Sequence, residues 1–229
     1  RGPARTMEIS PPYDFITREN YTWLDLKFEQ DLCSSQITTL DNNKRCKNLT
    51  NGAWSSAQMQ PALSRNEHAA SNKFYFEVTM HFVKRTSDGI MVGVAKQFGN
   101  PNETNHYIKP HSYSYYSHNG SIYHNQTSVA YKRPLHSSDR LGVLLDMDRG
   151  ELAFAINGVN QGMALQDELL REGPLFPTVH IYYVNQTVSL MDMPLEMHSR
   201  LRKQEGLPDL LRALQIKDPD FPPLLVRLQ

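Results

Sequence analysis

Two tight-turn signals in the middle of the chain, separated by six residues, limit its fold more than any other feature. Asp148-Arg149-Gly150 and Asn157-Gly158 each contain residues that accept the positive φ angles of hairpin turns. Between them, Leu152, Phe154 and Ile156 alternate with other residues, as in a strand with one buried face. The stretches 141–145, 151–156 and 159–164 are therefore predicted to form a three-stranded antiparallel meander.

Other short runs of aromatic and β-branched residues, separated by Gly and Pro, predict an all-β protein. The run 74–80 predicts a strand with a core side that carries Phe74, Phe76, Val78 and Met80. The apolar run 90–95 is typical of a central strand covered on both faces. Further strands are expected at 23–28, 175–183 and 187–191. The Ser-, Thr- and Asn-rich residues 31–53 are expected to form a long loop.

Length and charge restrict the classes of partner. A chain of 229 residues fits a single large β domain, and 24 basic side chains balance 24 acidic ones. Because the net charge is zero, no overall field attracts nucleic acid, and no apolar run is long enough to span a membrane. We therefore expect neither a nucleic-acid nor a membrane partner. Residues 1–7 are charged without an apolar core and are expected to be a linker.

The C-terminal region has a different periodicity. Leu207, Leu210, Leu211 and Leu214 recur at helical spacing, and Pro208 stands at a suitable first helical position. We expect a short helical tail, within about 195–216, in a C-terminal extension that covers 194–229 and packs on the β domain. A detachable helix that docks on a partner is the alternative.

Cysteines and glycosylation signals bear on the compartment. Cys33 and Cys46 lie 13 residues apart without metal-like partners, so we expect free thiols in a reducing, cytoplasmic setting. Six N-x-S/T sequons support a lumenal or extracellular alternative, with a disulfide; they begin at Asn20, Asn48, Asn102, Asn119, Asn125 and Asn185.

Nothing in the sequence favours catalysis. The spacings of His106, His111, His118 and His124 fit neither a helical nor a strand metal site, and no nucleotide-binding or hydrolase motif occurs. We therefore expect no enzyme, no metal and no cofactor. Tyr113, Tyr115 and Tyr116 are expected in a core strand, with a binding rim as the alternative.

The order of these segments is specific. Phe-Tyr-Phe-Glu-Val, Val-Gly-Val-Ala, the aromatic segment 112–120, the block 139–165 and Leu-Phe-Pro-Thr-Val follow one another in residues 72–192. This order resembles the SPRY (B30.2-like) domain. The resemblance implies a bent, two-sheet antiparallel β-sandwich at about residues 8–193, which binds through loops at one end. It further implies a non-catalytic, monomeric module that binds a protein or peptide, as in ubiquitin ligases and scaffolds. A glycan-binding, lectin-like sandwich is the alternative.

One branch of that family, the SOCS-box SPRY proteins, binds peptides with aromatic residues at places that resemble Tyr107 and Tyr183. The second aromatic is usually Trp there, and this chain lacks the Cys-bearing box, which argues against membership of that branch. Loops after 92–94 and after 175–183 are expected to meet at one end. The predicted partner-binding residues are Arg65, Tyr107, Ile108, Tyr182 and Tyr183.

Overall fold

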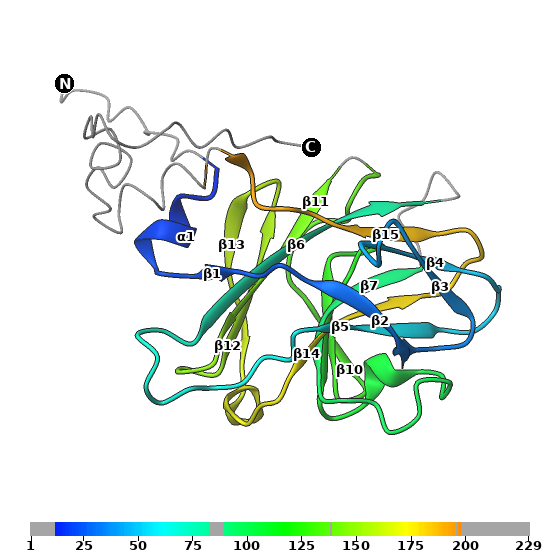
Figure 1. Cartoon of the computed structure of the whole chain (residues 1–229), viewed down its shortest axis with the longest axis horizontal. Helices are drawn as coiled ribbons and strands as arrows, with labels where there is room; N and C mark the ends of the chain where they lie inside the picture. The colour runs from blue at the N-terminus through cyan, green and yellow to red at the C-terminus, as the bar shows by residue number, and fades with distance from the viewer. Residues whose placement is uncertain (1–11, 83–88, 138, 196, 198–229) are drawn as a thin grey trace, which may run out of the picture. The chain divides into compact units, whose positions relative to one another are not determined.

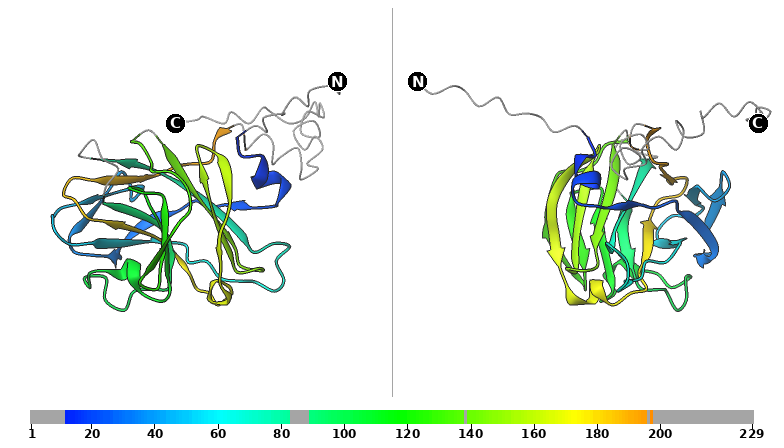
Figure 2. Two further views of the ribbon diagram at one scale, coloured as in Figure 1. Left: turned by 180° about the vertical axis from the view of Figure 1, so that it is seen from behind. Right: turned by 60° about the vertical axis from the view of Figure 1, so that its left-hand side comes forward.

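A computed structural model describes residues 12–82, 89–137, 139–195 and 197. The chain divides into two units, residues 1–193 and 194–229. The strands of the first unit form two sheets in facing layers (Figures 1 and 2). The predicted two-sheet, antiparallel β-sandwich is confirmed. The predicted linker at 1–7 and the leucine-rich helix at 207–214 lie outside the described residues.

The larger sheet, called sheet A, has eight strands. They are β1 (Thr22–Trp23), β3 (Ile37–Leu40), β4 (Arg45–Asn48), β6 (Lys73–His81), β11 (Arg140–Asp146), β12 (Glu151–Ile156), β13 (Val159–Gln166) and β15 (Thr187–Leu190). Seven of them follow the order β13-β12-β11-β6-β15-β4-β3, and β1 pairs with β6 in parallel. Every other pairing within the described residues is antiparallel.

The second sheet, called sheet B, has seven strands in the order β10-β9-β8-β7-β14-β5-β2. They are β2 (Lys27–Cys33), β5 (Ser55–Gln60), β7 (Ile90–Ala95), β8 (Ser112–Tyr116), β9 (Ser121–His124), β10 (Thr127–Ala130) and β14 (Phe176–Ile181). The helices of the described part are short: α1 (Asp14–Arg18), and the 3-10 turns η1 (His106–Ile108) and η2 (Glu168–Arg171).

The predicted meander is confirmed as β11-β12-β13. Asn157 and Gly158 take φ angles of 54° and 78°, and positive φ at both positions is what a two-residue hairpin turn needs. At the other turn, the Asp146 carboxylate accepts hydrogen bonds from the backbone N–H groups of Asp148 and Arg149. Local turn chemistry therefore fixes the register of this part of sheet A.

The core lies between the two sheets, where alternate residues of each strand meet. Leu152 and Phe154 are fully buried there, as predicted, together with Tyr113 and Tyr115 from β8. Both cysteines are also buried in this core, as free thiols. Because one face of each strand is used for the core, the opposite face remains for other contacts.

Two sequence expectations about the N-terminal third are wrong. Residues 31–53 are not one long loop, because β3 and β4 form a hairpin there. Three successive residues at its turn, Asp41, Asn42 and Asn43, have positive φ, and this polar turn dominates the composition of the segment. The expected strand at 23–28 is divided instead, since β1 ends at Trp23 and β2 begins at Lys27.

The outer face of β6 is covered by the N-terminal segment, which crosses sheet A with α1 and β1 (Figure 1). Glu77 points to this side and is 2% exposed. Its carboxylate accepts hydrogen bonds from the hydroxyl groups of Tyr13, at 2.9 Å, and Tyr75, at 3.2 Å. Burial raises the pKa of Glu77. Sheet A is therefore packed on both faces here.

Candidate partner-binding site

Five aromatic side chains gather on the outer face of sheet B. We call Trp54, Tyr107, Tyr116, Tyr123 and Tyr182 the aromatic cluster. The centroid of the Trp54 ring lies 5.0 Å from that of Tyr107 and 5.3 Å from that of Tyr182. Tyr116 lies 5.9 Å from Trp54 and 5.5 Å from Tyr123. All five residues are half-buried, so each ring touches its neighbours and still offers surface to solvent.

Strand alternation sets which residues reach this face. Val179 and Ile181 of β14 are buried in the core, so His180 and Tyr182 point outward. The same alternation on β8 places Tyr116 outward, since Tyr115 faces the core. Tyr182 and Tyr116 thus reach the same face from two different strands, and both contact Trp54 there.

Tyr107 reaches the cluster from a loop that begins at the far end of the sheet. β7 and β14 are antiparallel, with Ala95 opposite Phe176 and Ile90 opposite Ile181. The loops after these two strands therefore leave from opposite ends, and the expectation that they meet at one end is wrong. Residues 96–111, drawn in green at the lower right of Figure 1, instead bring Tyr107 back over the outer face to Trp54.

The floor beneath Tyr107 is buried and uncharged. His180 is fully buried, its Nδ1 lies 2.8 Å from the Ser56 hydroxyl, and its ring lies 6.1 Å from that of Tyr107. Burial lowers the pKa of His180 to about 3, so the ring is neutral at physiological pH. The ring of Phe98 stacks on His106 at 3.8 Å and lies 6.1 Å from His180.

Hydrogen bonds hold the loop 96–111 against the sheet. The Gln58 amide donates through Nε2 to the carbonyl of Lys96, at 2.9 Å, and accepts from the Phe98 N–H, at 3.0 Å. Further along, His106 Nε2 lies 3.0 Å from the carbonyl of Asn100. One glutamine of β5 thus fixes the start of the loop through both ends of its amide.

The other predicted residues next to the cluster differ in their surroundings. Ile108 is half-buried, and its carbonyl accepts a hydrogen bond from the Gln126 N–H at 3.1 Å. Tyr183 comes after the end of β14, with its ring 5.0 Å from that of Tyr182. It lies against Gly89, where an added Cβ atom would approach the Tyr183 ring to 2.7 Å. Tyr183 therefore supports the edge of the cluster.

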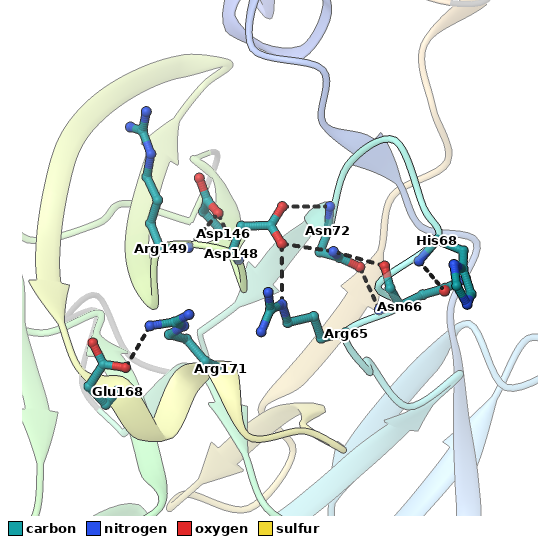
Figure 3. Close-up of polar contacts among 9 residues, drawn as sticks. All are labelled: Arg65, Asn66, His68, Asn72, Asp146, Asp148, Arg149, Glu168 and Arg171. Atoms are coloured by element: carbon teal, nitrogen blue, oxygen red, sulfur yellow. Dashed lines mark hydrogen bonds and ion pairs between the residues drawn. The ribbon is translucent and has the colours of Figure 1, made fainter.

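Arg65 lies away from the cluster. Leu63, two residues before Arg65, pairs with Leu175 just before β14, whereas Tyr182 comes just after that strand. Six strand residues at about 3.3 Å each separate the two ends by roughly 20 Å. Figure 3 shows the Arg65 side chain beside Asp148, with Nε 3.4 Å from the carboxylate.

The carboxylate of Asp148 also accepts hydrogen bonds from Asn72, at 2.8 Å from the side-chain amide and 3.2 Å from the backbone N–H. These bonds from Asn72, with the one from Arg65, hold the pKa of Asp148 below its usual value. Asn72 in turn accepts a hydrogen bond from the Asn66 N–H (Figure 3). Arg65 thus belongs to a network that ties the loop after β5 to the β11–β12 turn.

A profile of the SPRY domain matches residues 73–193, which is more than half of the 229 residues. The chain belongs to the SPRY domain family. The match begins at the start of β6 and ends after β15, so it includes four of the five rings of the aromatic cluster. SPRY domains are generally interaction modules that bind proteins or peptides, and they are generally not catalytic.

Solved SPRY domains share the fold at low sequence identity. The SPRY domain of human HERC1 is 18% identical with a TM-score of 0.58, over 73% of this chain and 99% of that chain. The TRIM65 PSpry domain is 16% identical with a TM-score of 0.58, over 78% and 98%. A human SPRY domain is 19% identical with a TM-score of 0.52, over 70% and 98%. A comparison with curated proteins gives no match.

The described part of this SPRY domain contains no group of three His, Cys, Asp or Glu side chains placed to hold a metal ion. In the same residues, none of the helices has the length and apolar character needed to cross a bilayer. The chemistry that the outer face of sheet B does offer is aromatic contact area on a neutral floor.

Sequence reasoning missed Trp54 and Tyr123. Trp54 follows the turn residues Asn51 and Gly52 and directly precedes β5, a strand that the sequence pattern did not predict. A Trp between a turn signal and a strand was the available signal, because such a side chain is large and rarely left without contacts.

Proposed function

We propose that the aromatic cluster binds a short segment of another protein, so that this SPRY domain is a partner-recognition module. The observation that carries the proposal is the gathering of five half-exposed rings on one face, with Trp54 in contact with three of them. Trp and Tyr dominate interface hot spots because they supply large contact area with few rotatable bonds.

The cluster is also suited to binding because its geometry is fixed in advance. Tyr107 rests on the buried His180, and Gln58 holds the start of its loop. A pre-formed surface loses little conformational entropy when the partner docks. Losing one central aromatic anchor typically costs about 2 kcal/mol, or roughly thirtyfold in affinity.

Affinity capture with the full chain tests the proposal. We expect Trp54→Ala and the double variant Tyr107→Ala/Tyr182→Ala to lose at least roughly thirtyfold in partner affinity, as central anchors do. Arg65→Ala is the matched control, because Arg65 lies at the other end of β14 and should leave capture unchanged. Circular dichroism of each variant establishes that it is folded.

Equal capture by the folded Trp54 variant and the wild type would place the partner site elsewhere on the domain. A glycan array with the same proteins addresses the lectin-like alternative, since aromatic rings also stack on sugars. Wild-type binding to glycans that is lost in Trp54→Ala, without capture of any protein, would replace the peptide proposal.

We further propose that the domain acts as a monomer in the cytoplasm and serves as the recognition part of a ubiquitin ligase or scaffold. Cys33 and Cys46 are buried thiols, which suits a reducing compartment. Asn48, the start of one sequon, is fully buried, and its side-chain amide donates to the carbonyl of Thr50 at 2.9 Å. Light scattering and glycosidase treatment of protein from its native cells test these points.

A further inference from the structure

A pocket of about 230 Å³ lies within the segment 96–112, the loop that carries Tyr107 together with the first residue of β8. Its lining includes Lys96, Phe98, His106, Lys109 and Ser112. We call it the loop pocket. His106 lines this pocket, and the next residue in the chain, Tyr107, belongs to the aromatic cluster. Because successive Cα atoms are about 3.8 Å apart, the loop pocket and the cluster are neighbouring features of one loop.

The loop pocket has an excess of positive charge. The Lys96 ammonium group donates to the backbone carbonyls of Glu172 and Gly173, and it has no carboxylate partner in the part of the chain that the structure describes. Lys109 is different, because it forms an ion pair with Glu103, which also lines the pocket. Among the Lys and Glu side chains of the lining, one ammonium group therefore remains without a carboxylate partner.

A buried hydroxyl group adds a second feature. Ser112 is 1% exposed, and its Oγ atom has no hydrogen-bond partner among the described residues. A buried polar group without a partner is unfavourable, and native proteins rarely keep one without a reason. An acceptor oxygen that entered the loop pocket could be hydrogen-bonded by this hydroxyl and held by the charge of Lys96.

We propose that the loop pocket binds the carboxylate of an Asp or Glu side chain in the partner segment, while neighbouring residues of that segment contact the aromatic cluster. One uncompensated ammonium group and one free hydroxyl match the single charge of a carboxylate. A phosphate group carries a charge of about −1.5 to −2, which a single ammonium group does not balance. This proposal rests on the proposed function for its occupant, but the pocket can be tested without a partner.

The test is a titration of the ¹⁵N-labelled full chain with N-acetyl-glutamate amide, followed by backbone amide shifts. N-acetyl-glutamine amide, which has the same shape without the charge, is the matched probe, and inorganic phosphate is the third. We expect saturable shifts at Lys96, His111 and Ser112 with the glutamate probe and at least tenfold weaker binding of the other two. Absence of saturation, equal binding of the glutamine probe, or tighter binding of phosphate would each overturn the proposal.

Two variants sharpen the test. Ser112→Ala removes an unpartnered hydroxyl, so the melting temperature should not fall, while binding of the glutamate probe should weaken at least fivefold. Lys96→Met should weaken binding of the glutamate probe at least tenfold. Lys27→Met, which changes an exposed lysine on β2, is the control and should leave this binding unchanged. Unchanged probe binding in folded Ser112→Ala and Lys96→Met would refute the assignment of these residues.

The two proposals fail in different ways. Trp54→Ala should abolish partner capture and leave the binding of the glutamate probe intact, because Trp54 does not line the loop pocket. Probe binding with capture that is insensitive to Trp54 would refute the proposed function alone. Capture that depends on Trp54, without any probe binding, would refute the loop pocket alone.

Discussion

Phe154→Ala tests whether the sandwich is held together where the sequence and structure agree. Phe154 lies in the middle of β12, opposite Val143 of β11, and is fully buried. Its ring lies 5.2 Å from that of Tyr115 of sheet B and 6.1 Å from that of Tyr131. The side chain therefore joins the two sheets, and its removal leaves a cavity that the surrounding strands cannot easily fill.

Truncation of a buried Phe to Ala typically costs about 3–5 kcal/mol, since transfer free energy and packing are lost together. For a domain of this size, each kcal/mol lowers the melting temperature by about 2–4 °C, which predicts a fall of roughly 6–20 °C. Val143 on the adjacent strand and Tyr115 on the facing sheet are both fully buried, which favours the upper half of this range.

Thermal unfolding followed by circular dichroism gives the measurement. Val159→Ala on the adjacent strand β13 is the control, because Val159 is 53% exposed and should change stability by less than about 1 kcal/mol. A Phe154→Ala protein that melts within about 2 °C of the wild type would refute the packing described for the two sheets.

Three further predictions concern titration and thiols. Hydrogen bonds from Arg133 hold the pKa of Asp139 below its usual value, so this carboxylate stabilises the fold above pH about 4 and less below it. The melting temperature of Asp139→Asn should therefore lie below that of the wild type at pH 7, and this difference should be smaller at pH 3. Burial lowers the pKa of His180 to about 3, whereas the unfolded value is about 6.5, so stability falls as pH drops between these values. His180→Gln should reduce that slope, and an equal slope in both proteins contradicts the assignment. Burial raises the pKa of Cys33 to about 12 and holds that of Cys46 well above its usual value, so both thiols should resist alkylation in the folded protein. Both should react after unfolding without reductant, and no gain of mass at that point would reveal a disulfide.

Those parts of the fold that local chemistry determines were predictable from the sequence. The Asn157-Gly158 turn, the alternation of Leu152 and Phe154 and the apolar run of β7 each specify a conformation within a few residues. Each was confirmed. The β3–β4 hairpin was missed. Each of its strands has only four residues beside the polar turn at Asp41, which is too short for apolar and polar residues to alternate recognisably.

The site was only partly predictable, because its geometry depends on contacts between distant segments. Tyr107 and Tyr182 were predicted to lie together and both belong to the cluster, but the route is different from the expected one. The loop turns back over sheet B because Gln58, which precedes Lys96 by 38 residues, binds its backbone. A contact between residues so far apart in the sequence leaves no local pattern from which it could be predicted. The separation of Arg65 from the tyrosines could not be predicted for the same reason.

The core and the aromatic cluster use opposite faces of the same strands in this domain. β14 gives Val179 and Ile181 to the core and turns His180 and Tyr182 toward the candidate site. β8 makes the same division between Tyr115 and the outward-facing Tyr116. Substitutions in the cluster therefore remove contact area without opening the core between the sheets. We therefore expect substitutions in the cluster to cost the fold little stability, whereas a change at Phe154 affects both sheets.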